Sequence, residues 1–152
     1  LGQSYTNKVW PTENRTENLE KGVKWFKCAA NKGNSQAIIL LAQAYTIGTG
    51  VPQDTKHAKE LLAKAGEKGE PILGHLGAVY FTEGNVGKAL ELWREGASKN
   101  DACSLYNLGS VYCNGEGVER DFKKAGEYLQ RAAALGYPMA QQFLEQYKEF
   151  FK

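Results

Sequence analysis

The chain has 152 residues, 42% of them hydrophobic, which is enough to bury a core as one domain or as one short array of repeats. Nineteen basic and 17 acidic side chains leave a formal net charge of +2. Because Lys and Arg are dispersed, the sequence predicts no basic surface for nucleic acid. No apolar run approaches the roughly 18 residues of a membrane span, so membrane insertion is not expected.

Three cysteines, Cys28, Cys103 and Cys113, form an odd and sparse set. Neither a C-x-x-C pair nor a Cys/His cluster with metal-ligand spacing occurs, so we expect no metal and no cofactor. Residues ten apart on one helix lie about 15 Å apart along its axis, so Cys103 and Cys113 cannot form a disulfide if both are helical. We interpret all three as small buried side chains.

Tyrosines recur at positions 5, 45, 80, 112 and 147, and each ends a stretch with helical spacing. In "LGAVY" (76–80) and "LGSVY" (108–112), Leu, a small residue and Tyr share one helix face. A period of 32 to 40 residues predicts stacked helical units. We call the helix that ends at each Tyr helix A. Its small residue costs helix propensity, so a neighbouring helix is expected to approach closely there.

A second helix, helix B, is expected after the loop that follows each Tyr. An Asn or Asp N-cap opens it, because the side-chain oxygen accepts free backbone N–H groups. A Gly or Asn that adopts the left-handed conformation ends it. The expected N-caps are Asn18, Asp54, Asn85 and Asp121, and the expected terminators are Gly33, Gly69, Asn100 and Gly136.

Only the loop between helices A and B varies much in length. The sequence therefore predicts one repeat domain, with insertions confined to one edge of the stack. Its parts are a partial first repeat (1–33) with a long loop (6–17), repeats 34–69, 70–100 (short loop) and 101–136, and a C-terminal helix (137–152). The chain opens abruptly with "LGQSY" and shows no signal peptide, which leaves open that an upstream segment was removed.

The stretch "YCNGEGVERDF" (112–122) has the glycine spacing of a phosphate-binding loop. Such loops bind phosphate when they connect a strand to the N-terminus of a helix. Here the glycines follow a helix, and "YTIGTGVPQD" (45–54) repeats them, so we predict an inter-helix turn. Gly115 and Gly117 supply backbone freedom, and we expect Val51 and Val118 to fill the space beneath the two loops.

The motif L-G-x-x-Y-x-x-G-x-G-V-x-x-D-x-x-K-A, followed by an aromatic residue or Leu and then A-A-x-x-G, resembles the Sel1-like repeat. This family is a relative of the tetratricopeptide repeat with a longer inter-helix loop. The resemblance covers nearly the whole chain and is closest over 108–136, whereas the copy at 76–100 lacks the second Gly and the Val of the loop. It implies an all-α fold, a right-handed superhelical α-solenoid of antiparallel helix pairs whose A helices line a concave surface.

The resemblance also implies a module that binds proteins or peptides and has no chemistry of its own. Many bacterial members are exported and act as scaffolds in envelope assembly or host interaction, or neutralise a secreted effector. The expected partner is therefore a protein or peptide, such as a bacterial effector or envelope protein. Family habit favours a periplasmic or otherwise exported location, whereas unpaired cysteines suit a reducing compartment, so the location stays open.

One stripe of helix A should form the concave surface. It is polar at both ends and has Phe81 and Tyr106 near its middle, as expected for a protein-binding groove. The alternative is that Phe81 packs against the loop after it and Tyr106 against its neighbouring helix. Trp10 is a second candidate anchor unless it folds back onto the first repeat. The candidate partner-binding residues are Gln43, Thr46, His75, Phe81, Tyr106, Asn107, Ser110, Cys113 and Trp10.

We expect no enzymatic activity. His57 and His75 are the only histidines. A pair of His75 with Cys113 across adjacent repeats is conceivable, but nothing in the sequence orients it or indicates a depressed thiol pKa. Three functions remain: an interaction scaffold, an immunity-type inhibitor of a secreted effector, and a peptide- or glycan-binding receptor module.

Overall fold

The computed structural model describes residues 12–151, and all regular secondary structure within them is helical. Eight α-helices in this range are followed by a short 3-10 helix, η1. Their bounds are α2 Thr12–Asn31, α3 Ser35–Ile47, α4 Thr55–Glu67, α5 Leu73–Thr82, α6 Val86–Ser98, α7 Ala102–Asn114, α8 Phe122–Ala134, α9 Pro138–Gln146 and η1 Lys148–Phe151. No helix within these residues is long and apolar enough to cross a membrane.

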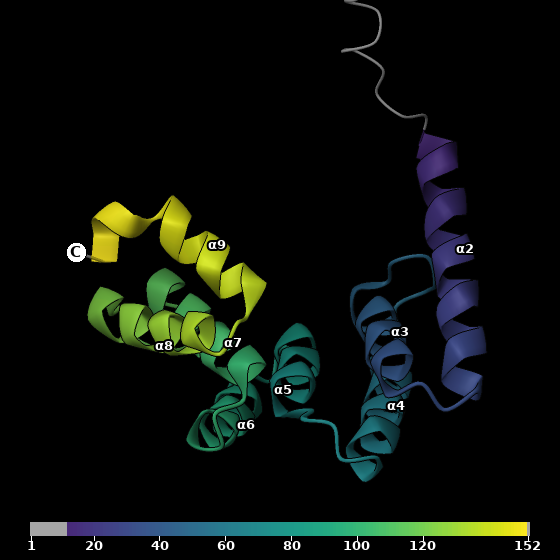
Figure 1. Ribbon diagram of the computed structural model, residues 1–152, viewed down its shortest axis with the longest axis horizontal. Coiled ribbons are helices and arrows are strands. Elements are labelled where there is room, and N and C mark those ends of the chain that lie inside the picture. Colours follow the sequence, from purple (N-terminus) through teal and green to yellow (C-terminus); the bar gives the residue numbers. More distant parts are fainter. Residues whose placement is uncertain (1–11, 152) are drawn as a thin grey trace, which may run out of the picture. The chain divides into compact units, whose positions relative to one another are not determined.

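The helices alternate as predicted, with α3, α5, α7 and α9 as A helices and α2, α4, α6 and α8 as B helices. Consecutive helices form antiparallel pairs, such as α5 with α6 and α7 with α8 (Figure 1). This arrangement is an α-solenoid. The chain divides within α4 into two units, Leu1–Leu61 and Leu62–Lys152, which are described separately.

In the first unit, α2 begins earlier than predicted. Residues 12–17 were expected in a loop and Asn18 at an N-cap, but α2 starts at Thr12 and Asn18 lies inside it. The reason is local: between Pro11 and Gly22 the sequence has no helix breaker. Glu17 and Lys21, one turn apart, also form an ion pair of 3.2 Å that supports helix.

The loop between α3 and α4 packs against α2, which explains its second glycine. Gly50 has φ +76°, and a Cβ there would lie 2.7 Å from the carbonyl oxygen of Leu19 and 2.9 Å from Cγ2 of Val23. Any other residue would therefore clash with the backbone of α2 and be strained as well. Gly50 therefore permits this loop to pack closely against α2.

The core of the second unit lies between its A and B helices. Leu105, Leu108 and Leu129 are fully buried in it. The predicted close approach at the small residue of helix A is confirmed here. A Cβ on Gly77 would overlap the indole of Trp93, and one on Gly109 would lie 2.6 Å from Cγ of Leu129.

The predicted helix ends are confirmed with one exception. Side-chain oxygens of Asp54, Asn85 and Asp121 accept backbone N–H groups of the first turn of α4, α6 and α8. All four expected terminators have positive φ: Gly33 86°, Gly69 89°, Asn100 57° and Gly136 86°. The exception is Asn18, because the helix that it was expected to open has already begun.

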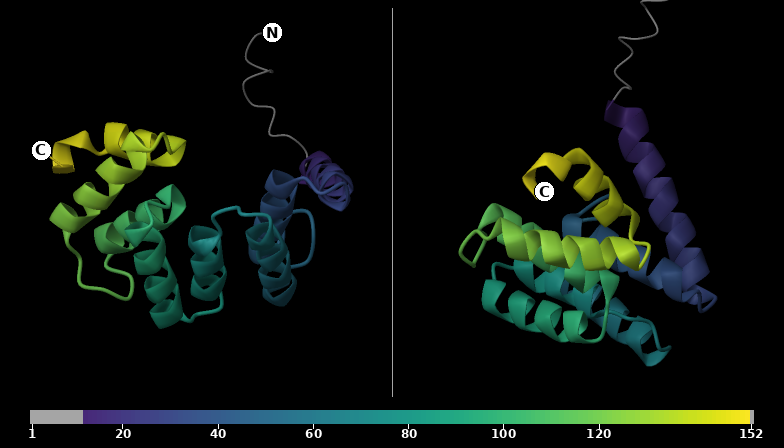
Figure 2. Two further views of the ribbon diagram at one scale, coloured as in Figure 1. Left: turned by 60° about the horizontal axis from the view of Figure 1, so that its bottom comes forward. Right: turned by 60° about the vertical axis from the view of Figure 1, so that its left-hand side comes forward.

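The "GEG" turn connects two helices, α7 and α8, as predicted. Gly115 and Gly117 have φ of 71° and 74°, and a Cβ on Gly117 would overlap the side chain of Val86. Val118 is half-buried and packs against the core, as expected. The C-terminal segment differs in part from the prediction, since α9 ends at Gln146 and η1 follows it (Figure 2).

Candidate partner-binding surface

The A helices α5 and α7 of the second unit meet at Gly74. Its carbonyl oxygen accepts hydrogen bonds from Trp93 Nε1 (3.0 Å) and Asn107 Nδ2 (3.3 Å). Its amide donates to Oδ2 of Asp101 (3.0 Å). A Cβ at this position would lie 2.5 Å from Cβ of Cys103, so only glycine permits the approach. The two helices therefore present their remaining residues as one joined surface.

We call this surface the A-helix face. It comprises the half-buried residues His75, Ala78 and Phe81 of α5 and Tyr106, Asn107, Ser110 and Cys113 of α7. The structure thus brings together six of the nine predicted site residues on two adjoining helices. All six keep part of their surface exposed, as a partner-binding residue requires.

The two central aromatic residues also pack within the protein. The ring of Phe81 lies 5.7 Å from that of Trp93 on α6. The ring of Tyr106 lies 5.3 Å from that of Tyr137 and 6.5 Å from that of Phe143, on the α9 side. Tyr106 therefore packs against its neighbouring helix while remaining half exposed. Neighbouring rings hold both side chains in place.

The aromatic surface extends onto α9, which the sequence interpretation missed. The ring of Tyr147 lies 4.8 Å from that of Phe143, tilted by 42°, and Tyr147 is 37% exposed; Met139 is 52% exposed. Tyr147 occupies the position in its repeat that Tyr112 occupies in the preceding repeat. Tyr112, however, is only 8% exposed. Helix α8 packs against α7, whereas within the described residues no B helix follows α9.

The predicted residues of the first unit behave differently. Thr46 is only 6% exposed, and its hydroxyl donates to the carbonyl oxygen of Ala42 at 2.7 Å. The carbonyl of Thr46 also accepts a hydrogen bond from Gln53 of the following loop. Thr46 therefore exposes almost none of its side chain, and we do not include it in the surface proposed below. Gln43 is half-buried, and Trp10 lies outside the described residues.

A thiol and an imidazole meet at one end of the A-helix face. Sγ of Cys103 lies 4.0 Å from Nδ1 of His75. The sequence interpretation had considered Cys113 for this pairing, but Cys113 lies ten residues further along α7 and thus about 15 Å away along the axis. His75 therefore pairs with Cys103 instead, which lies on the turn of α7 that faces Gly74.

The environment of this pair keeps both groups uncharged at neutral pH. Burial, together with the negative charge of Asp101, raises the pKa of the Cys103 thiol to about 11, although hydrogen bonds from Tyr137 and Asn107 oppose the shift. Burial lowers the pKa of His75, and Asp101 opposes this change. A nucleophilic cysteine needs a depressed thiol pKa, so the pair is not an activated nucleophile.

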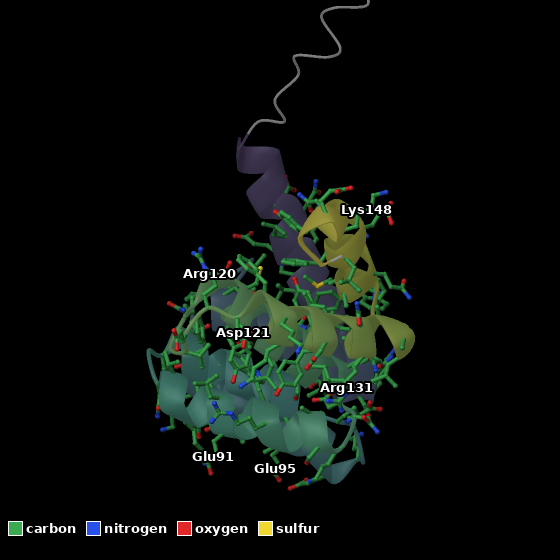
Figure 3. All side chains as sticks on the ribbon, turned by 90° about the vertical axis from the view of Figure 1, so that its left-hand side faces the viewer. Glu91, Glu95, Arg120, Asp121, Arg131 and Lys148 are labelled. Atoms are coloured by element: carbon green, nitrogen blue, oxygen red, sulfur yellow. The ribbon has the colours of Figure 1, made fainter. Side chains whose placement is uncertain are left out.

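Helices α6 and α8 of the second unit carry exposed charged side chains. Glu91 and Glu95 of α6 lie on the far side of the unit from Lys148 of η1 (Figure 3). Arg131 of α8 donates to the carbonyl oxygen of Ala97 and to Oδ1 of Asn100, both at 3.1 Å, and so joins two successive repeats. The aromatic groups of the A-helix face therefore differ in character from these charged side chains of α6 and α8.

A recess of about 850 Å³ lies beside the turns that precede α5 and α7. Two of the charged groups that line it are already engaged. Lys99 pairs with Glu95 at 3.4 Å, and Asp101 accepts from Gly74 and from the hydroxyl of Ser104. The described residues also contain no group of three or more His, Cys, Asp or Glu that could hold a metal ion. The A-helix face is therefore the stronger candidate.

Comparison with known proteins gives relatives that match most of this chain. The chain is 33% identical over 127 residues to the Sel1-repeat-containing protein YjcO of Escherichia coli K12, covering 77% of this chain and 55% of that protein. It is 27% identical over 139 residues to cytochrome c oxidase assembly factor 7A of Xenopus laevis, covering 82% and 60%. The chain thus spans little more than half the length of these curated relatives.

Two solved structures share the fold. A Sel1 repeat protein from Oxalobacter formigenes superposes with a TM-score of 0.54 at 28% identity, over 84% of this chain and 54% of that one. A protective antigen of uropathogenic Escherichia coli with an SLR fold gives 0.56 at 28% identity, over 90% and 33%. The Sel1 repeat model matches four consecutive segments, 14–34, 35–70, 73–101 and 104–137. Because these segments cover most of the sequence, the chain belongs to the Sel1 repeat family.

Proposed function

We propose that this protein is a non-enzymatic interaction module that binds a protein or peptide partner through the A-helix face and the adjoining aromatic residues of α9. Sel1 repeat proteins generally mediate protein–protein interactions, and their scaffold is generally non-catalytic. The observation that carries the proposal is the row of partly exposed, mutually packed rings formed by Tyr106, Tyr137, Phe143 and Tyr147.

These rings have the properties of a binding hot spot. Aromatic side chains bury a large area at a small cost in conformational entropy, and they dominate the energetics of many interfaces. Because each ring already packs against another, a partner need not order it, which lowers the entropic cost of binding. Exposed Met139 adds a flexible apolar side chain that adapts to different partner shapes.

The polar groups beside the rings favour a polypeptide segment as the partner. Asn107, Ser110 and His75 lie along the same face and carry amide, hydroxyl and imidazole groups. Such groups form the polar border of a protein interface, where they pair with backbone or side-chain groups of the partner. A segment with apolar side chains at intervals would place them on the rings and its polar groups on this border.

The test measures the affinity of a purified partner for selected variants. The partner is first captured from the native organism and identified by mass spectrometry. Calorimetry then compares the wild type with a Met139→Ala/Tyr147→Ala variant, which removes exposed side chains only. We expect affinity to fall by roughly 10–100-fold, since loss of hot-spot side chains costs 2 kcal/mol or more. Replacing Phe81 with Arg is less suitable, because its ring packs on buried Trp93.

Phe122→Ala is the matched control. Phe122 is 40% exposed on α8, beneath the guanidinium of Arg120, so its truncation also removes a partly exposed aromatic ring. We expect this variant to bind the partner as the wild type does. Equal affinity of the wild type and the Met139→Ala/Tyr147→Ala variant, or an equal loss with Phe122→Ala, would contradict the proposal.

A further inference from the structure

Polar and sulfur atoms of four side chains lie near one another where α5, α7 and the start of α9 meet. These residues are His75, Cys103, Tyr137 and Met139. Nδ1 of His75 and Sγ of Cys103 lie 4.0 Å apart. The hydroxyl of Tyr137 lies 3.9 Å from Sγ of Cys103 and also 3.9 Å from Sδ of Met139. The chain has only three cysteines and two histidines, so the contact between one of each calls for an explanation.

The spacing of the two nearest donors suits a single metal ion. Metal–sulfur and metal–nitrogen bonds measure about 2.3 and 2.0 Å, so two such donors on one ion lie at most about 4.3 Å apart. The observed separation of 4.0 Å falls just inside this limit, which corresponds to a wide angle at the metal. An ion that accepts two ligands at a wide, bent angle would fit, and a linear arrangement needs the two donors to move apart by about 0.3 Å.

We propose that His75 and Cys103 form a binding site for a soft monovalent metal ion, Cu(I). Thiolate and thioether sulfur select Cu(I) over harder ions, and imidazole is also a good copper ligand. Structural zinc sites take four ligands, and the described residues offer no group of three or more His, Cys, Asp or Glu. The donor set therefore discriminates against zinc.

The surrounding groups would stabilise the metal-bound form. Nδ2 of Asn107 donates to Sγ of Cys103 at 3.6 Å, and the hydroxyl of Tyr137 approaches the same sulfur. Both are donors that favour a negatively charged sulfur, and outer groups of this kind orient and tune a metal ligand.

Binding exchanges a proton for the metal without any redox step. The S–H bond of Cys103 breaks, its proton passes to the buffer, and a Cu–S bond forms. The unprotonated Nδ1 of His75 donates its lone pair, which requires the ring proton to sit on Nε2. The net charge of the site does not change, because one monovalent cation replaces one proton. Affinity must therefore fall as pH is lowered, since protons compete for both ligands.

The experiment titrates the purified full chain with Cu(I) under anaerobic conditions, in competition with the colorimetric chelator bicinchoninate. We expect one tightly bound ion per chain and a thiolate-to-copper absorption band in the ultraviolet. Cys103→Ala and His75→Gln should each remove the competitive site. Asn107→Leu should lower the affinity by roughly 10–100-fold, the range for outer groups of metal sites. Circular dichroism and thermal unfolding of each variant establish that the fold is intact.

The other two cysteines provide the control. In a Cys28→Ala/Cys113→Ala variant Cys103 is the only thiol, and we expect it to bind one Cu(I) as the wild type does. Binding that survives in Cys103→Ala, or that disappears when Cys28 and Cys113 are removed, would mean adventitious binding to an exposed thiol and would overturn the proposal. The titration needs no partner protein, and Met139→Ala/Tyr147→Ala leaves both ligands in place, so this test stands apart from that of the proposed function.

Discussion

The carboxylate of Asp101 accepts a hydrogen bond from the backbone amide of Gly74, 27 residues earlier, at 3.0 Å. Gly74 lies in the first turn of α5, whose N-cap position holds Ile72, a residue that cannot accept a hydrogen bond through its side chain. Asp101 stands at the N-cap of α7 but makes no capping bond to its own helix. One repeat thus supplies the cap of the helix that begins the repeat before it.

Asp101→Ala should lower the free energy of unfolding by roughly 2–3 kcal/mol. The same carboxylate oxygen accepts the hydroxyl of Ser104 at 2.7 Å, and both Ser104 and Gly74 are buried. The substitution leaves two donors without a partner, and each unsatisfied buried donor costs about 1–3 kcal/mol. Urea unfolding followed by circular dichroism measures the change.

Asp121→Ala is the comparison for this prediction. Asp121 caps only its own helix, through the amides of Lys123 and Lys124, and those bonds are exposed to solvent. Its loss should cost about 1 kcal/mol, as is typical of a helix cap. If the two variants were destabilised equally, the bond between repeats would contribute nothing beyond ordinary capping.

Gly109→Ala and Gly87→Ala should change stability in opposite directions. Alanine is favoured over glycine in a helix by about 1 kcal/mol, so Gly87, with no atom within 4 Å of its added Cβ, should gain up to that amount. At Gly109 the Cβ would lie 2.6 Å from Cγ of Leu129 and 3.3 Å from the carbonyl oxygen of Ala125. Forcing α7 and α8 apart should cost about 1–3 kcal/mol despite the gain in propensity.

Thermal unfolding of both variants measures these changes. A stabilised Gly109→Ala protein would show that the contact with Leu129 relaxes freely and that the small residue of helix A serves another purpose. The comparison also bears on Gly77, which meets Trp93 in the corresponding position of the preceding repeat.

The sequence predicted local geometry well because each signal had a local physical cause. Gly109 was singled out because glycine weakens a helix, and Asn100 because it tolerates positive φ, and the structure confirms both. The bond from Gly74 to Asp101 was missed, because no local pattern links residues in different repeats. α2 was misjudged for a similar reason, since its expected loop was assigned from the other repeats although its own composition favours helix.

The candidate site was predicted less completely than the fold. Periodicity placed Phe81 and Tyr106 on one surface, but it could not show that the loop residue Gln53 contacts Thr46, or that α9 leaves Tyr147 exposed. The pairing of His75 with Cys103 rather than Cys113 depends on where along their length α5 and α7 touch. Gly74 decides that register through contacts that only the folded structure reveals.

The three thiols should differ in their reactivity toward a maleimide or disulfide reagent, in the order Cys28, then Cys113, then Cys103. The prediction that all three cysteines are buried is wrong for Cys28, which is exposed, whereas the other two are half-buried. Burial raises the pKa of Cys113 as well, although Arg120 opposes it, and raises that of Cys103 to about 11. At pH 8 only roughly one Cys103 thiol in 1,000 is then the reactive thiolate.

Peptide mapping by mass spectrometry after timed labelling gives the three rates. The rate at Cys103 should continue to rise up to about pH 11, in step with its ionisation. Labelling of Cys103 as fast as Cys28 at pH 8 would contradict the buried, neutral thiol described above.

His75 should make the protein less stable as pH falls below neutrality. Burial holds its pKa in the folded protein below the ordinary value of 6.5. In the unfolded chain the imidazole takes up a proton near that ordinary value, so between it and the lowered pKa the unfolded state binds more protons. The free energy of unfolding therefore falls as pH is lowered through this window and levels off below the folded pKa.

The contribution of His75 is isolated by comparing the wild type with His75→Gln, since carboxylates affect both proteins equally. Urea unfolding at several pH values from 7 to 4 should show that the wild type loses more stability than the variant as pH falls. The NMR signal of the His75 ring, assigned with the same variant, should titrate with a midpoint below 6.5. A midpoint above that value, with a steeper loss in the variant than in the wild type, would mean that the charge of Asp101 outweighs burial at this site.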